Sequence, residues 1–178
     1  MTLYSLKTDG KVLGIYFSLG TTPSKDPGLS CSKAICDLFK AAKVSALVSI
    51  YSLSEASIID SMIAAHKRGV NVVVVADYIQ SQGKNMNQYL KKLETAGIPI
   101  FIASKQKACM HNKVGIFDSL YVATGSYNWT SNGTRKNDEN LVVMEGTDLA
   151  NAYEKYVFER VVNNETASKI YGYRLTKN

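Results

Sequence analysis

Short continuous apolar runs alternate with amphipathic segments through the first hundred residues, and no other feature of the chain restricts its fold more. The apolar runs predict buried strands at residues 44–51, 71–76 and 98–102. The amphipathic segments predict helices at residues 31–42, 52–68 and 85–96. Parallel strands need a crossover of this kind, because a tight turn cannot join them. The pattern therefore predicts an α/β fold built on parallel crossover units.

The ends of the expected helices carry local signals. Ser52 and Glu55 have the spacing of a capping box, while Gly69 and Gly97 are typical of helix ends. Further elements are expected as a strand at residues 12–18, a strand at 140–144 and a terminal helix at 148–162. Because these helices can cover both faces, we expect a mixed sheet flanked by helices, in a single domain that spans residues 1–178.

Two short apolar runs, residues 113–117 and 120–124, are separated only by Asp118 and Ser119. This spacing predicts a β-hairpin with a two-residue loop, in which Phe117 pairs with Leu120. Asp118 lies about 23 Å along an extended strand from position 111, at roughly 3.3 Å per residue. We therefore interpret Asp118 as a turn or packing residue.

The open end of this hairpin gathers polar residues. In the predicted register His111 faces Ser126 and Lys113 faces Thr124. Because strand side chains alternate, His111, Lys113 and Ser126 then share one face, which Asn128 joins if the chain stays extended. If the turn were longer or shorter by one residue, the polar side chains of one strand would lie on the opposite face of the hairpin.

These residue types form a set with a common chemistry. Histidine can attack phosphorus, and lysine, serine and asparagine donate hydrogen bonds to phosphodiester oxygens. With Asp118 and Gly125 they make six spaced matches, which chance would produce at on the order of 10⁻⁸ per starting position. The set could therefore run phosphoryl transfer without a metal.

The spaced set from His111 to Asn128 resembles the motif of the phospholipase D superfamily. In length and element order the chain is similar to the small single-motif members, the bacterial endonucleases of the Nuc type. The resemblance implies a phospholipase D-like fold with no metal and no cofactor. It also implies that His111 is the nucleophile and forms a phosphohistidine, while Lys113 and Asn128 hold the non-bridging oxygens. Ser126 would add a hydrogen bond there, or satisfy the turn after Gly125.

A nucleophilic histidine benefits from a hydrogen-bond acceptor on its second ring nitrogen. Glu139 begins the strand that follows the motif, and it resembles an acidic position of the small family members. We favour Glu139 for this role over the neighbouring Asp138, with an ordinary carboxylate at a strand end as the alternative.

Three nearby residues and a second histidine have plainer interpretations. Gly125 is expected to let the chain turn closely past the phosphate. Tyr127 and Trp129 either stack on a base or pack within the loop. His66 lies late in an amphipathic helix, which indicates a solvated imidazole favoured by the helix dipole.

The family usually carries two copies of the motif, one histidine attacking and the other protonating the leaving oxygen. This chain has one copy, so the general acid is expected from a second chain across a two-fold axis beside His111. The sequence therefore predicts a homodimer that hydrolyses DNA, or also RNA.

The chain has 21 Lys and Arg against 15 Asp and Glu, which gives a formal charge of +6 and favours a polyanionic partner. Basic residues flank the motif and are expected to contact substrate: Lys105, Lys107, Arg135 and Lys136. Lysine-rich loops can also serve solubility alone. The three cysteines, Cys31, Cys36 and Cys109, are too few for a disulfide framework, and together with His111 they would make only an improvised zinc site.

No apolar run approaches the roughly 20 residues that cross a bilayer, and the first seven residues do not have a signal-peptide pattern. The expected location is cytoplasmic, or exported or periplasmic if a leader has been removed.

Two other functions remain open. A phospholipase D or cardiolipin hydrolase would use the same chemistry on lipids, but it should have an apolar rim or an interfacial amphipathic helix, and the sequence shows no convincing one. A catalytically silent nucleic-acid-binding module should have lost His111 or Lys113, and both are present.

Overall fold

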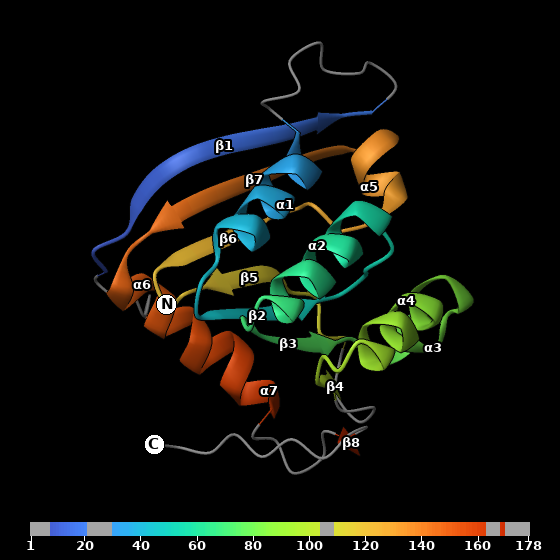
Figure 1. Cartoon of the computed structure of the whole chain (residues 1–178). Helices are drawn as coiled ribbons and strands as arrows, with labels where there is room; N and C mark the ends of the chain where they lie inside the picture. Colours follow the sequence, from blue (N-terminus) through green and yellow to red (C-terminus); the bar gives the residue numbers. More distant parts are fainter. Residues whose placement is uncertain (1–7, 21–29, 104–108, 163–167, 170–178) are drawn as a thin grey trace, which may run out of the picture.

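An eight-stranded mixed sheet forms the centre of the molecule in the computed structural model, which describes residues 8–20, 30–103, 109–162 and 168–169. The strand order is β1-β7-β6-β5-β2-β3-β4-β8 (Figure 1). The strands are β1 (Lys11–Leu19), β2 (Ser45–Ile50), β3 (Asn71–Ala76), β4 (Ile100–Ile102), β5 (Lys113–Phe117), β6 (Tyr121–Gly125), β7 (Asp138–Glu145) and β8 (Ser168–Lys169). Strands β2, β3 and β4 are parallel, and the other neighbouring pairs are antiparallel. The predicted α/β class with a mixed sheet is confirmed.

One face of the sheet is covered by three helices: α1 (Cys31–Ala41), α2 (Ala56–Lys67) and α4 (Lys84–Thr95) (Figure 1). Each helix buries residues three or four positions apart, such as Ile58, Met62 and Ala65 of α2. This spacing keeps one apolar stripe on the sheet and leaves the polar side to solvent.

The opposite face is covered by the C-terminal helical segment, which comprises α6 (Thr147–Tyr153), a π-helical stretch η2 (Glu154–Glu159) and α7 (Arg160–Val162). Ala150 and Phe158 pack there against sheet residues that include Val73, Val114 and Ile116. The sequence predicts one α-helix over this segment, and the structure has a π-helical middle instead. Two five-residue helices, α3 (Tyr78–Gln82) and α5 (Ser131–Arg135), are too short for periodicity to predict.

The register of the β5–β6 hairpin differs by one residue from the predicted one. Phe117 pairs with Tyr121 rather than with Leu120, and Thr124 pairs with Val114 rather than with Lys113. The predicted pairing, which also made His111 face Ser126, is therefore wrong.

The reason lies outside the hairpin. Leu120 N donates to Phe117 O at 3.0 Å and closes the turn, but the Leu120 carbonyl accepts a hydrogen bond from Gly146 N at 2.9 Å, and Tyr121 is the residue that pairs with Phe117. Asp118 and Ser119 both have positive φ, at 53° and 49°, and Asp118 N bonds to Ser45 O. Contacts with the end of β7 and the start of β2 thus produce a loop of three residues, where the sequence predicts a loop of two.

The predicted capping box is also wrong. Glu55 itself occupies the N-cap position of α2 and makes no side-chain cap, while Leu53 forms a bridge with Trp129. The backbone N–H groups of Ser54 and Glu55 both bond to Trp129 O. The chain therefore stays extended against Trp129 until α2 begins at Ala56. Ser52 lies too far before the helix to cap it.

Strand β1 forms one edge of the sheet and carries an exposed apolar row. Leu13, Ile15, Phe17 and Leu19 are each 42–50% exposed. They lie at alternate positions, so they share one face of the strand. We call these four residues the β1 row. Within the described residues, no helix is long and apolar enough to cross a membrane.

Candidate active site

The expected catalytic residues lie along the edge of the sheet that is formed by strand ends, where β2 and β6 end and β5 and β7 begin. Ile50 at the end of β2 pairs with Lys113 at the start of β5. Gly125 at the end of β6 pairs with Leu141 of β7. Strands far apart in sequence thus bring the motif and the residues after it to a common edge.

The segment that leads to His111 is held by a buried carboxylate. Asp77 caps α3 by accepting a hydrogen bond from Gln80 N, and its other oxygen accepts one from Met110 N, both at 2.9 Å. On the other side of the segment, Tyr51 N donates to Asn112 O at 2.7 Å. These bonds fix the backbone immediately before and after His111.

Lys113 lies directly against His111. Its Nζ donates to the His111 carbonyl at 2.9 Å and lies 3.2 Å from Nδ1 and 3.4 Å from Nε2 of the ring. The Lys113 side chain is only 7% exposed and makes no ion pair with any described residue. Burial lowers the pKa of this lysine below its ordinary value, opposed by the negative charges of Glu139 and Cys109. A buried cation without a counterion is suited to binding an anion beside the imidazole.

Tyr51 is a candidate site residue that the sequence does not point to. Its ring lies 4.4 Å from the His111 ring between centroids, tilted by 51°, and Lys113 Nζ is 4.9 Å from its centroid. The hydroxyl accepts a hydrogen bond from Gln80 Nε2 at 3.1 Å. An aromatic residue at the end of a buried strand is common in any sheet, so no sequence signal marks this one.

Ser126 and Glu139 form a hydrogen-bonded pair. Ser126 Oγ donates to Glu139 Oε2 at 2.6 Å and accepts from Asn140 N at 3.1 Å. Asn137 Nδ2 donates to Glu139 Oε1 at 3.1 Å. The expected hydrogen bond from His111 to Glu139 is not among those of the described residues. Glu139 instead holds Ser126 and acts on Lys113 through its charge.

The loop after β6 is anchored by its aromatic side chains. Tyr127 and Trp129 are fully buried and pack in the core with the helices of the first face. Of the two open interpretations, packing is therefore the one that the structure supports. Asn128 lies between them with its side-chain carbonyl oxygen buried and without a hydrogen-bond partner among the described residues.

Two residues of the motif, Gly125 and Asp118, have contacts that support the fold. A side chain on Gly125 would place its Cβ 2.2 Å from Asn140 O, so close packing against β7 requires glycine there. Asp118 accepts backbone hydrogen bonds from Lys43, Val44 and Ser45 at 2.8–3.2 Å. Burial works against ionisation of Asp118, but these hydrogen bonds outweigh it and lower its pKa.

The basic residues differ in their surroundings. Arg135 makes two hydrogen bonds to the buried carboxylate of Glu55, at 3.0 and 3.2 Å. Lys136 is exposed. Lys105 and Lys107 lie outside the described residues. Asp138 is exposed at the start of β7, opposite Leu19 of β1.

The second histidine lies away from this edge. His66 is in the last turn of α2, about 15 Å along the helix axis from its first residue at 1.5 Å per residue. Its Nε2 faces Gly97, and its Nδ1 is buried without a partner among the described residues. The start of α2, where Glu55 N bonds to Trp129 O, is the end near the site.

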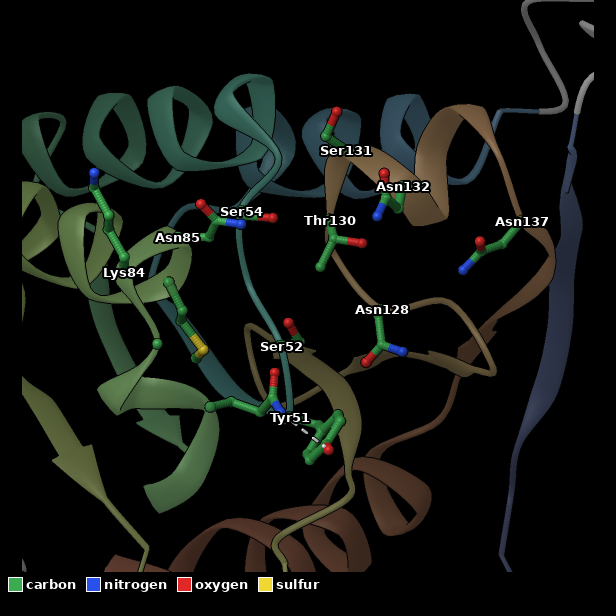
Figure 2. A pocket seen from close by; sticks show the side chains of 13 residues that line it. Tyr51, Ser52, Ser54, Lys84, Asn85, Asn128, Thr130, Ser131, Asn132 and Asn137 are labelled. Carbon is green, nitrogen blue, oxygen red and sulfur yellow. Dashed lines mark hydrogen bonds between the residues drawn. The ribbon is translucent and has the colours of Figure 1, made fainter.

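A cavity of about 580 Å³ opens beside Tyr51 (Figure 2). In Figure 2, Asn85 of α4 lies on one side, and Asn128, Asn132 and Asn137 lie on the other. The lining residues are Tyr51, Ser52, Ser54, Gln80, Gly83, Lys84, Asn85, Met86, Asn128, Thr130, Ser131, Asn132 and Asn137. They come from five separate segments of the chain, which is why the sequence does not reveal the cavity.

Cys31, Cys36 and Cys109 are free thiols. Burial raises the pKa of the Cys31 thiol. Within the described ranges, no three His, Cys, Asp or Glu side chains form a group that could hold a metal ion.

Comparison with known proteins places this geometry in a family. Residues 35–162 match the family described as cardiolipin synthase, PLD-like domain. The chain is 34% identical over 138 residues to a phospholipase D of Rickettsia bellii, covering 78% of this chain and 67% of that protein. It is 30% identical over 114 residues to the mitochondrial cardiolipin hydrolase of Xenopus laevis, covering 63% of this chain and 51% of that protein. The solved structure of a phospholipase D family member, Nuc from Salmonella typhimurium, matches with a TM-score of 0.79 and 27% identity, over 92% of this chain and 100% of that one.

Proposed function

The chain belongs to the phospholipase D superfamily and is a phosphodiesterase, and on that premise we propose that it hydrolyses nucleic acid through a phosphohistidine on His111, without a metal. The observation that carries the mechanism is Lys113, a buried cation against both ring nitrogens of His111 that has no carboxylate paired to it among the residues the structure describes. Such a charge stabilises the extra negative charge on phosphorus in the transition state.

The proposed reaction has two displacements. In the first, a ring nitrogen of His111 bonds to phosphorus, the bond from phosphorus to the leaving oxygen breaks, and that oxygen takes a proton from a general acid. In the second, the same group removes a proton from water, whose oxygen bonds to phosphorus as the P–N bond breaks. Lys113 and Asn128 hold the non-bridging oxygens, while Ser126 and Glu139 position this edge of the site.

We assign the general acid to His111 of a second copy of the chain. His66 is the remaining histidine of the sequence, and it lies at the far end of α2, packed against Gly97. A two-fold axis beside His111 would supply the missing imidazole and make the site common to both chains.

The choice of nucleic acid, DNA or also RNA, rests on charge and on the surroundings of the site. The chain has a formal charge of +6, and Arg135 and Lys136 lie on and just after α5, which borders the cavity. The resemblance to the Nuc-type endonucleases points the same way.

A phospholipid phosphodiesterase is the second candidate, and the β1 row favours it. The row runs toward the site, because Leu19 pairs with Asp138 and Ser18 pairs with Glu139. An exposed apolar row beside an active site could enter a lipid surface. The polar cavity beside Tyr51 is less suited to an acyl chain, which is why we rank this function second.

The test is to assay purified protein on single-stranded oligonucleotide, plasmid and phosphatidylcholine vesicles in excess EDTA, with His111→Asn as the control. We expect cleavage of nucleic acid that survives EDTA and is absent from the control. Lipid turnover without nucleic acid turnover would reverse the ranking. Binding of nucleic acid without turnover would indicate a silent module. Activity lost on chelation and restored by one divalent cation would indicate metal-activated water.

A further inference from the structure

The cavity beside Tyr51 is lined by a set of side chains whose chemistry is unusual for a phosphate site. It contains the carboxamides of Gln80, Asn85, Asn128, Asn132 and Asn137, together with several hydroxyls. Of its described lining residues none is acidic, and Lys84 is the one cation. A wall of this kind offers many hydrogen-bond donors and acceptors and little charge.

Several of these groups are free to bind a ligand. The side chains of Asn85 and Asn132 make no hydrogen bond within the part of the chain that the structure describes. Asn128 Oδ1 is buried and also lacks a partner there. Since a buried acceptor without a partner is costly, this oxygen is suited to accept a hydrogen bond from a ligand N–H or O–H group.

Tyr51 joins the cavity to the chemistry. The Tyr51 ring contacts His111, and the same residue lines the cavity and accepts a hydrogen bond from Gln80. A group bound in the cavity would therefore lie one side chain away from the phosphorus that His111 attacks.

We propose that this cavity binds the nucleoside next to the scissile phosphate, with its base unpaired. Asparagine and glutamine are the side chains that match the donor and acceptor edge of a base. A cavity of about 580 Å³ is within the usual range for small-molecule sites, about 300–1,000 Å³. A base can enter such a cavity only when it is not in a duplex, so the preferred substrate is single-stranded. This inference rests on the proposed function and adds the substrate class to it.

The test uses His111→Asn protein, so that binding is measured without turnover, and titrates it with a single-stranded 12-mer and with the matching duplex. We expect tighter binding of the single strand. In this background Asn85→Ala and Asn132→Ala should each weaken single-strand binding about five-fold, the effect of one lost hydrogen bond. Gln88→Ala is the matched control, because Gln88 is an exposed carboxamide on the same helix that does not line the cavity.

Two features separate a nucleoside from other occupants. The Asn85 side chain is neutral and displaces no counterion from phosphate, so Asn85→Ala should lower affinity while the salt dependence stays the same. Asn85→Leu keeps the side-chain size but removes its polarity. It should weaken single-strand binding, whereas it would strengthen binding to phosphatidylcholine vesicles if the cavity held an acyl chain.

The outcomes distinguish this inference from the proposed function. Duplex bound as tightly as single strand, or Asn85 and Asn132 variants that bind like the parent, would overturn the nucleoside site even if wild-type protein cleaves nucleic acid. Wild-type protein that cleaves lipid and no nucleic acid would overturn the proposed function, whatever the binding experiment gives. Stronger vesicle binding by Asn85→Leu would reassign the cavity to a lipid chain.

Discussion

At the scale of single residues, Lys113 combines a cost in stability with its proposed role in the reaction. Its pKa lies below the ordinary 10.5, mainly because burial disfavours the cation. A lowered pKa means that the charge destabilises the folded chain at pH values below the folded-state pKa. This destabilisation fades as the pH rises from that value toward 10.5.

We therefore expect Lys113→Met to lose turnover by about 10²–10³-fold, the usual effect of removing one transition-state donor. At neutral pH it should unfold at the same temperature as wild type or higher, and any gain should shrink as the pH is raised. Turnover and thermal unfolding measured between pH 7 and pH 10 check both statements. Lys67→Met, at an exposed lysine in the last turn of α2, is the control and should change neither. Near-normal turnover of Lys113→Met would remove the lysine from the mechanism.

At the scale of elements, Asp118 ties the β5–β6 loop to the chain that enters β2. Its carboxylate accepts hydrogen bonds from three successive backbone N–H groups. The backbone of Asp118 has φ 53°, which asparagine tolerates better than alanine does. Asp118→Asn therefore removes the charge with little added strain.

We expect Asp118→Asn to lower the free energy of unfolding by about 1–2 kcal/mol at pH 7, since hydrogen bonds to a charged group are among the stronger ones. The lowered pKa means that the stabilisation is complete above the ordinary 3.8 and is lost as the pH falls through the folded-state value. Urea unfolding of both chains at pH 7 and below pH 4 should show the difference shrinking in acid. A difference that is independent of pH would show that the charge is not responsible.

At the scale of the whole molecule, the positive charge should appear in the salt dependence of binding. If Lys136 contacts a phosphate, Lys136→Ala should reduce the slope of log affinity against log salt by about 0.7 for a single strand. Arg135→Ala should also reduce the slope, but it leaves the buried Glu55 carboxylate unpaired and should therefore lower the melting temperature as well. Binding titrations at several salt concentrations, with melting curves, separate the two. An unchanged slope in both variants would place the phosphate path elsewhere.

The proposed sharing of the site between two chains has a quantitative consequence. When wild-type and His111→Asn chains are unfolded together in equal amounts and refolded, only wild-type homodimers would have two imidazoles. Activity should then fall to about a quarter of that of an all-wild-type sample, against about half for independent sites. A charge tag on one chain verifies that subunits exchange. A value near half with exchange verified would require a general acid within the same chain.

Local sequence pattern by itself determined the α/β class, the approximate bounds of the longer helices and strands, and the residue types of the phosphodiester motif. These follow from periodicity and spacing within a few residues, as in α2, where Ile58, Met62 and Ala65 define the buried stripe. The two five-residue helices, α3 and α5, contain too little helical pattern for such a prediction.

Only the tertiary structure decided the hairpin register, the partners of Glu139 and Arg135, and the existence of the cavity. In each case the outcome depends on a contact with a residue that is distant in sequence. Gly146 N donates to the carbonyl of Leu120, whose N–H bonds to Phe117 O, and Glu55 pairs with an arginine 80 positions away. Because such partners are chosen by how the layers pack, a pattern read along the chain cannot supply them.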